Sequence, residues 1–142
     1  MIAVDTNILV YSHREDSPFH GSAWDNLSKL AGSPGSWAIP WPCIHEFLSI
    51  VTHPRIYQPP SPLPEALDTV QAWLESPNLT LLCEGPDYLN QLGRLLVAGK
   101  VVGPKVHDAR IAALCLSHGV RALWSADRDF SRFPMLKVRN PL

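Results

Sequence analysis

Short apolar runs alternate with longer stretches of helical spacing along the chain. The runs are three or four residues long and carry branched or aromatic side chains, which is typical of buried strands. We expect strands at residues 2–4, 37–39, 79–82, 121–124 and 135–138, the last at a sheet edge. We expect a first helix capped by Asn7, followed by helices at 20–30, 42–52, 64–75, 88–98 and 108–117. This alternation predicts an α/β fold, with a mainly parallel sheet between helices on both faces.

Proline and glycine mark several of these boundaries. Pro42 suits the first turn of a helix, and Gly119 stands where the helix at 108–117 should end. Residues 57–64 are rich in proline and should form a loop. The chain shows no repeat and no linker that would divide it, so we expect one domain over residues 1–142.

Composition excludes several classes of protein. The 142 residues are 46% hydrophobic and 18% charged, which supports a sizeable core and argues against disorder. The net charge of −1 gives no overall basic field, although a local basic rim can coexist with an acidic pocket. The three cysteines form no CxxC pair and are expected to be buried thiols in a reducing compartment.

Targeting and membrane segments are not expected. The start of the chain lacks a basic region followed by a long apolar core, so no secretory signal is visible. No apolar run approaches the roughly 20 residues of a membrane span. We therefore expect a soluble, cytoplasmic protein that does not contact a membrane.

Five carboxylates lie beside apolar sequence rather than in charged runs. They are Asp5, Glu46, Asp108, Asp127 and Asp129. A carboxylate that points into a core is costly unless it is paired or metal-bound, and several in one place repel one another. A divalent cation removes both problems, so the pattern favours Mg²⁺ or Mn²⁺ and metal-assisted hydrolysis.

Two of these acids follow expected strands. Asp5 comes directly after the run at residues 2–4, and Asp127 follows the run at 121–124. Ligand sites in open α/β sheets lie at the carboxyl ends of strands, so both residues are expected at the functional edge. For Asp5 alone, an ordinary cap or turn role is an equal alternative.

The other two principal acids lie on apolar helix faces. Asp108 shares its face with Ile111 and Cys115, and Glu46 shares its face with Cys43. The alternatives are a helix-dipole role for Asp108 and a capping or salt-bridged role for Glu46. The inward direction of Asp108 favours a metal ligand.

The segment after the fourth strand holds residues with supporting roles. Asp127 and Asp129 flank Arg128, and Asp127 is nearer the strand end. Asp127 is therefore better placed to reach the site, and a role for Asp129 is to organise the loop by accepting backbone N–H groups. The sequence alone does not separate the roles of the two aspartates. Ser125 would position a water or an aspartate, with a plain turn hydroxyl as the alternative.

Histidine, basic and tryptophan residues add little. The six histidines lack the spacing of a zinc site. A basic rim for phosphate is suggested by the cations of segments flanking the acids, although plain solvation is the better interpretation of each one. These cations are Arg14, Arg55, Lys100, Lys105, Arg110 and Arg128. The five tryptophans are expected mostly in the core.

Four motifs together resemble PIN-domain ribonucleases. They are Asp5-Thr6-Asn7-Ile8-Leu9-Val10-Tyr11, Glu46 in its helix, Val106-His107-Asp108-Ala109 and Ser125-Ala126-Asp127-Arg128-Asp129-Phe130. The chain is most similar to VapC-like toxins of type II toxin–antitoxin pairs. Trp41-Pro42, Thr52-His53-Pro54-Arg55 and Arg139-Asn140-Pro141-Leu142 resemble a subgroup common in mycobacteria. The opening motif alone would be weak, but four motifs in order cover essentially the whole chain.

The resemblance implies a three-layer α/β/α PIN-like fold and an endoribonuclease that depends on Mg²⁺ or Mn²⁺. It implies Asp5, Glu46, Asp108 and Asp127 as the catalytic acids, with Asp5 and Asp108 binding the principal cation. Asn7, Ser125 and Asp129 would support them, and Ser125 stands where the family often has threonine. A metal-activated water would attack in line and leave a 5′-phosphate and a 3′-hydroxyl. The implied partners are RNA and a small VapB-like antitoxin, and a homodimer is compatible with the resemblance.

Two other classes of function stay open at this point. A metal-dependent phosphatase of a small phosphoester would use clustered aspartates, but the chain has Asp5-Thr6-Asn7 where such enzymes carry Asp-x-Asp. A non-catalytic domain that binds RNA or a protein partner would keep the fold, but it has little reason to retain every acid. The sequence does not specify the RNA target or the number of metal ions.

Overall fold

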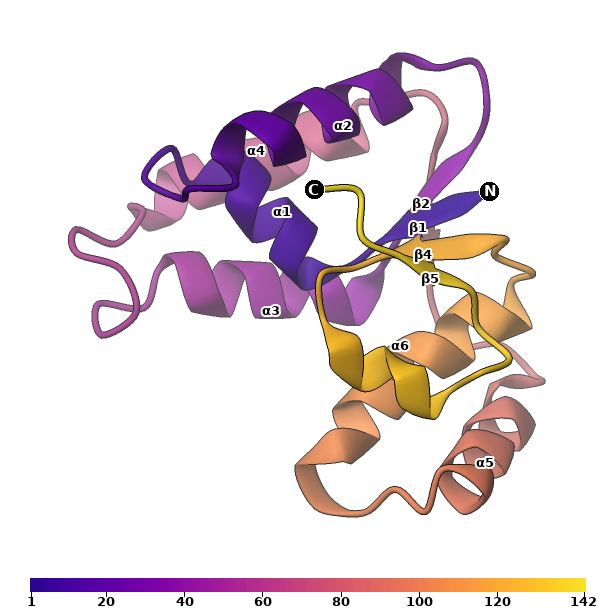
Figure 1. The fold of residues 1–142 in the computed structure, drawn as a ribbon. Coiled ribbons are helices and arrows are strands. Elements are labelled where there is room, and N and C mark those ends of the chain that lie inside the picture. The colour runs from indigo at the N-terminus through magenta and orange to yellow at the C-terminus, as the bar shows by residue number, and fades with distance from the viewer.

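A parallel sheet of five strands lies at the centre of the molecule (Figure 1), in a computed structural model that describes residues 1–142. The strands are β1 (Ile2–Val4), β2 (Trp37–Pro40), β3 (Leu79–Leu82), β4 (Ala122–Trp124) and β5 (Val138–Arg139). Their order across the sheet is β3-β2-β1-β4-β5, and every neighbouring pair is parallel. The first strand of the chain is therefore the central strand of the sheet.

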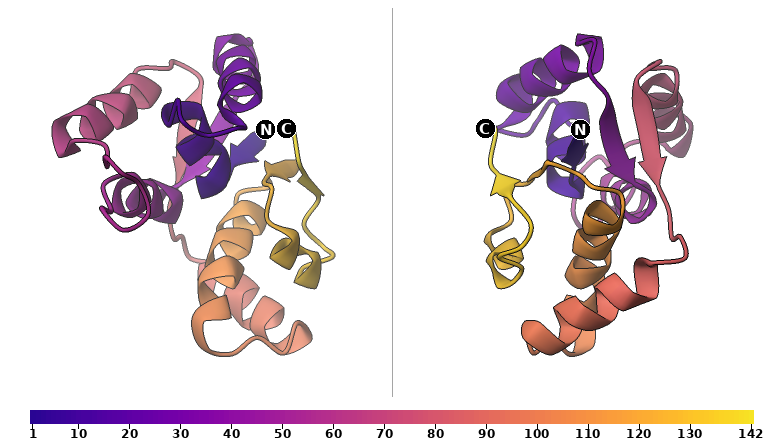
Figure 2. Two further views of the ribbon diagram at one scale, coloured as in Figure 1. Left: turned by 60° about the vertical axis from the view of Figure 1, so that its left-hand side comes forward. Right: turned by 90° about the vertical axis from the view of Figure 1, so that its right-hand side faces the viewer.

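Six α-helices connect and cover the strands. They are α1 (Thr6–His13), α2 (His20–Gly32), α3 (Trp41–Val51), α4 (Leu63–Leu74), α5 (Tyr88–Ala98) and α6 (Val106–Ser117). Helices α5 and α6 lie on the opposite side of the sheet from α2, in Figure 1 and in both views of Figure 2. The three-layer α/β/α architecture expected from the sequence is confirmed. None of the helices is both long and apolar enough to span a membrane.

Most element boundaries agree with the sequence pattern to within two residues, and two expectations were wrong. Helix α1 is capped by Asp5, whose side chain accepts a hydrogen bond from the Thr6 N–H, and not by Asn7. The strand expected at 135–138 is only Val138–Arg139. The apolar residue Leu136 belongs instead to a turn, in which its N–H donates to the carbonyl of Phe133. Its apolar character reflects burial in that turn and not strand pairing.

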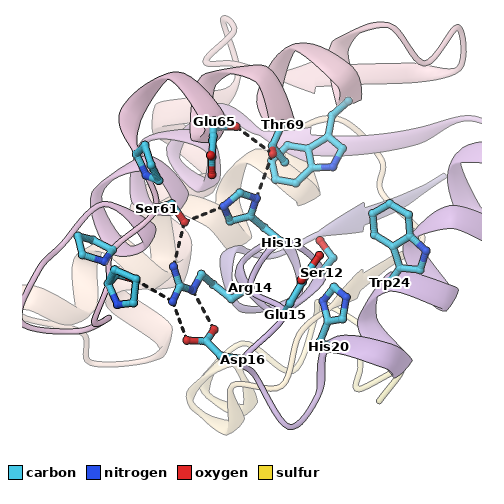
Figure 3. A pocket seen from close by; sticks show the side chains of 14 residues that line it. Ser12, His13, Arg14, Glu15, Asp16, His20, Trp24, Ser61, Glu65 and Thr69 are labelled. Carbon is cyan, nitrogen blue, oxygen red and sulfur yellow. Dashed lines mark hydrogen bonds and ion pairs between the residues drawn. The ribbon is translucent and has the colours of Figure 1, made fainter.

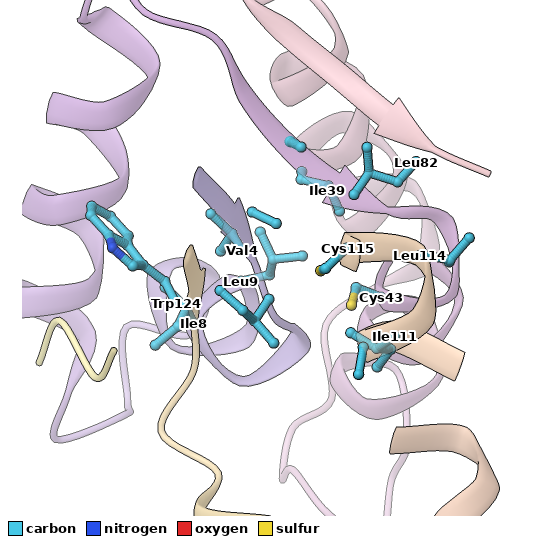
Figure 4. Packing of buried hydrophobic residues seen from close by; sticks show 14 of the residues in the cluster. Val4, Ile8, Leu9, Ile39, Cys43, Leu82, Ile111, Leu114, Cys115 and Trp124 are labelled. Carbon is cyan, nitrogen blue, oxygen red and sulfur yellow. The ribbon is translucent and has the colours of Figure 1, made fainter. Parts of the chain in front are cut away.

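The buried core joins the sheet to the helices on both sides. Figure 4 shows side chains of β1, β2 and β3 beside residues of α6 and Cys43 of α3. Two burial expectations were wrong: Cys83 is exposed, and Trp24 is 57% exposed on α2. Cys83 follows β3, at the end of a strand next to a surface loop, where its neighbours no longer cover it. Trp24 projects into a surface groove that is described below.

Candidate active site

The ends of β1 and β4 bring residues far apart in the sequence into contact. Val4 and Trp124 are partners in register, so Asp5 and Ser125, which follow them, lie side by side at the carboxyl edge. The Asp5 N–H donates to the carbonyl of Trp124 at 2.9 Å. The Ser125 hydroxyl donates to Asp5 Oδ2 at 2.6 Å, within the range of a strong charge-assisted hydrogen bond. Ser125 therefore positions an aspartate.

Asp5 is a buried carboxylate with several donors around it. It is 4% exposed. Oδ1 accepts from the Thr6 N–H at 2.8 Å and from the Cys43 thiol at 3.6 Å, and Oδ2 also accepts from Asn7 Nδ2 at 3.2 Å. Desolvation nevertheless outweighs these donors and raises the pKa of Asp5 to about 6. This carboxylate would gain from any cation that reached it.

Asn7 connects the two strand ends. Its side-chain Nδ2 donates to Ser125 Oγ at 3.2 Å as well as to Asp5, and its Oδ1 accepts from the Ala126 N–H at 3.1 Å. The amide group thus contacts both strand ends, namely Asp5 after β1 and the residues Ser125 and Ala126 after β4. Asn7 is therefore a positioning residue for Asp5 and for the loop after β4.

Glu46 reaches the same place from α3. Its Oε2 accepts a hydrogen bond from the Thr6 hydroxyl at 3.3 Å. Burial raises the pKa of Glu46, and the negative charge of Asp108 raises it further. The Thr6 hydroxyl opposes this rise because it hydrogen-bonds to the carboxylate.

Asp108 lies in the first turn of α6. This helix leads back to the start of β4, so its N-terminus lies near the carboxyl edge of the sheet. Burial raises the pKa of Asp108, and the neighbouring charge of Asp127 adds to that rise. The residue thus points toward other acids, as its position on an apolar helix face predicted.

The structure separates the roles of Asp127 and Asp129, which the sequence left open. Asp127 organises the loop, because its Oδ1 accepts the Asp129 N–H at 2.8 Å and caps the short 3-10 helix Arg128–Arg132. Asp129 instead forms an ion pair with the ammonium group of Lys105. The backbone contact falls to Asp127 because the acceptor of an N-terminal cap precedes the helix it caps.

One pocket of about 280 Å³ gathers the four principal acids. Its lining also includes the apolar side chains of Val10, Ile50 and Ile111, with Tyr11 and Tyr57 as aromatic neighbours. The residues that line it are Asp5, Thr6, Asn7, Val10, Tyr11, Glu46, Ile50, Tyr57, Asp108, Ile111 and Asp127. Negative charge is therefore concentrated in a partly apolar hollow, where it is poorly screened.

Three carboxylates of this region are close enough to share a cation. One ligand oxygen from each of Asp108, Asp127 and Asp129 lies within 4.8 Å of the others. Oxygen donors of this kind suit Mg²⁺ or Mn²⁺. Asp5 and Glu46 border the same pocket but lie outside this group of three, and both oxygens of Asp5 already accept hydrogen bonds.

A second and larger hollow lies beside the first. It has a volume of about 750 Å³ and is lined by the end of α1, the start of α2, the loop at residues 59–62 and α4. In Figure 3, His13 hydrogen-bonds to Ser61 and Thr69, at 2.8 Å and 3.0 Å, across this groove. Arg14 pairs with Asp16 there and also lies 4.2 Å from the ring centroid of Tyr57, which lines the acidic pocket. The groove and the acidic pocket are therefore neighbours.

Sequence reasoning missed three contributors to the site. Thr6 orients Glu46, Cys43 donates to Asp5, and Tyr57 forms part of the pocket wall. Thr6 could have been found from the sequence, because it carries a hydroxyl and directly follows an acid at the end of an expected strand. Nothing local pointed to Tyr57, because it comes from the proline-rich segment and reaches the pocket only in the folded chain.

Comparison with known proteins gives a consistent family. Residues 2–135 match the family described as PIN domain. Ribonuclease VapC31 of Mycobacterium tuberculosis is 32% identical over 143 aligned positions, covering 100% of both chains. Ribonuclease VapC48 of the same species is 29% identical and covers 96% of this chain and 94% of its own.

Solved structures share the fold. VapBC2 from Rickettsia felis, bound to a DNA fragment from its promoter, superposes with a TM-score of 0.73 at 21% identity, covering 99% of this chain and 98% of the other. VapC20 of Mycobacterium tuberculosis, described as a sarcin-ricin loop cleaving toxin, gives a TM-score of 0.69 at 18% identity, covering 92% and 93%. At these identities the likeness concerns the architecture alone.

The raised pKa of Asp5 predicts how metal-free stability changes with pH. Folding favours the protonated form of Asp5. The contribution of Asp5 to the free energy of unfolding is therefore most favourable at low pH and becomes less favourable as pH rises from about 3.8 to about 6. That change is worth about 3 kcal/mol in the free energy of unfolding. In EDTA, Asp5→Asn should therefore gain about 2 to 3 kcal/mol relative to the wild type between pH 4 and pH 8.

Urea unfolding at both pH values measures this difference. Asp68→Asn, at an exposed position on α4, is the matched control and should follow the wild type throughout. If the stabilities of Asp5→Asn and of the wild type change in parallel from pH 4 to pH 8, the pKa of Asp5 is not raised in the folded protein.

Proposed function

The chain belongs to the PIN domain family, and from this membership we propose that it is an endoribonuclease and the toxin of a type II toxin–antitoxin pair. The observation that carries the proposal is the convergence of Asp5, Glu46, Asp108 and Asp127 on one pocket at the carboxyl edge of the sheet. Relatives that match the full length of the chain are named ribonucleases. RNA is the proposed substrate, and we propose the cytoplasm as the location of the protein for that reason.

The donor set fits a divalent metal ion. Asp108 and Asp127 would hold it, and Asp129 has an oxygen within reach of both. Asp5 and Glu46 line the same pocket and would add negative charge near the ion. Mg²⁺ or Mn²⁺ bound there would lower the pKa of a coordinated water and neutralise charge that develops on the phosphate. The raised pKa values of Asp5, Glu46 and Asp108 support this assignment, because a cation would relieve the cost of ionising all three.

The protein's own groups prepare the pocket for a phosphodiester. Ser125 and Asn7 fix Asp5, and the Thr6 hydroxyl fixes Glu46, so neither carboxylate has to reorganise during the reaction. With the cation bound, ionised carboxylates orient the attacking water and accept its proton. No serine or cysteine nucleophile is required, and burial raises the pKa of the Cys43 thiol well above its usual value, which keeps it inert.

An antitoxin is the proposed partner. The groove between α1, α2 and α4 is large enough for a peptide segment, and the exposed ring of Trp24 offers it an apolar contact. The groove adjoins the acidic pocket through Arg14 and Tyr57. A segment bound there would place a basic side chain among the catalytic carboxylates and compete with the cation.

Loss of a catalytic acid should abolish cleavage while preserving the fold. We expect Asp5→Asn and Asp108→Asn each to lower kcat/KM on RNA by roughly 100-fold or more, because each weakens the metal site. Asp68→Asn is the control and should cleave like the wild type. The assay compares a structured RNA with a small phosphomonoester, with and without Mn²⁺. Preference for the phosphomonoester, or full RNA cleavage by either folded variant, would refute the proposal.

Metal binding should stabilise the folded protein. A cation present at about 100 times its Kd adds about 2.7 kcal/mol to the free energy of unfolding, if it binds only the native state. Thermal melts in EDTA and in Mn²⁺ should therefore differ, and the difference should shrink in Asp108→Asn. Superimposable melting curves of the wild type in the two buffers would count against the site.

Inhibition by the antitoxin should depend on a basic side chain. We expect the product of the neighbouring open reading frame to co-purify with this protein and to suppress RNA cleavage. Replacing its arginines one at a time should identify one whose loss restores activity without abolishing binding, because that side chain reaches the acidic pocket. Full inhibition that survives every such substitution would show that the partner blocks the enzyme elsewhere.

A further inference from the structure

Lys105 places a positive charge at the edge of the acidic cluster. It is the last residue of the short 3-10 helix Gly103–Lys105 and directly precedes α6. Its ammonium group pairs with Asp129 and lies 3.9 Å from an oxygen of Asp108. These are two of the three carboxylates whose oxygens lie within 4.8 Å of one another. The lysine and a divalent cation therefore draw on the same ligands.

We propose that Lys105 is a substrate-binding residue that exchanges Asp129 for a phosphate of the RNA backbone when a divalent cation occupies the carboxylate cluster. This inference rests on the ribonuclease proposal and adds to it a residue that contacts the substrate. Its chemistry is an ammonium–phosphate ion pair, which positions the strand and reads no base.

The exchange follows from charge. The ammonium and a divalent cation would repel each other if both lay beside Asp108 and Asp129, because they would be like charges held close together by the same carboxylates. The cation holds two charges to the lysine's one and takes oxygen ligands directly, so the lysine is the group that leaves. The Lys105 side chain is 43% exposed and has a flexible four-carbon stem, which lets it swing toward solvent.

The released ammonium would stay close to the pocket that would hold the scissile phosphate. Lys105 does not line the acidic pocket, but its ammonium lies 3.9 Å from an oxygen of Asp108, which does. A scissile phosphate at the pocket therefore leaves Lys105 beside a flanking phosphate of the same strand. Binding there would replace the carboxylate partner with another anionic oxygen, so the ammonium keeps a counter-charge throughout.

The test compares Lys105→Gln with Lys100→Gln. Lys100 is exposed, lies in the same segment between α5 and α6, and forms no ion pair. Its variant makes the same change in net charge as Lys105→Gln. By titration calorimetry with Mn²⁺ and no RNA, Lys105→Gln should bind the ion about fivefold more tightly than the wild type, since a competing charge is gone. Lys100→Gln should bind Mn²⁺ like the wild type.

The second arm measures RNA. At saturating Mn²⁺, Lys105→Gln should raise KM for a single-stranded RNA about fivefold with kcat changed less than about twofold, and should make log affinity fall less steeply with log salt, by about 0.7. Lys105→Arg keeps the charge and should restore both values. Lys100→Gln should show neither change.

Two results would overturn the proposal. Weaker or unchanged Mn²⁺ binding in Lys105→Gln would mean that the lysine only holds the loop. An RNA KM and salt slope equal to those of Lys100→Gln would mean that it does not contact the substrate. A wild-type protein that cleaves no RNA would refute the ribonuclease proposal itself, and the calorimetric comparison would still decide whether lysine and cation compete.

Discussion

The hydrogen bond from Ser125 to Asp5 holds a carboxylate inside the protein at the junction of β1 and β4. Burial makes that carboxylate costly to ionise, and the negative charge of Glu46 increases the cost. The surrounding donors from Thr6, Asn7 and Cys43 reduce this cost without removing it. The site thus lowers the stability of the metal-free protein in exchange for a strong attraction to cations.

This attraction would draw several kinds of cation to one place. A metal ion, the ammonium of Lys105 and a basic side chain of a partner would all compete for the same oxygens. The metal ion would support catalysis, Lys105 would supply a counter-charge in the resting protein, and the partner's side chain would inhibit. A single concentration of negative charge would therefore link metal loading, substrate binding and neutralisation.

The groove beside the acidic pocket is connected to it by shared side-chain contacts. Arg14 joins the two hollows, because its guanidinium pairs with Asp16 in the groove and lies over the ring of Tyr57 in the pocket wall. His13 ties α1 to α4 through Thr69, and to the loop at 59–62 through Ser61. A partner that fills the groove would therefore contact elements that also shape the acidic pocket.

The sequence by itself determined the alternation of strands and helices, the parallel sheet and the acids at its carboxyl edge. These follow from local periodicity and from the placement of Asp5 and Asp127 directly after apolar runs. The tertiary structure alone decided which acids cluster, because the order of strands in the sheet sets which strand ends are neighbours. It also decided that Asp127 caps its own loop while Asp129 pairs with Lys105, and that Tyr57 forms part of the pocket wall. Some of those contacts join residues distant in sequence, and others depend on which of two nearby acids forms them. A local pattern of hydrophobic and polar positions encodes neither.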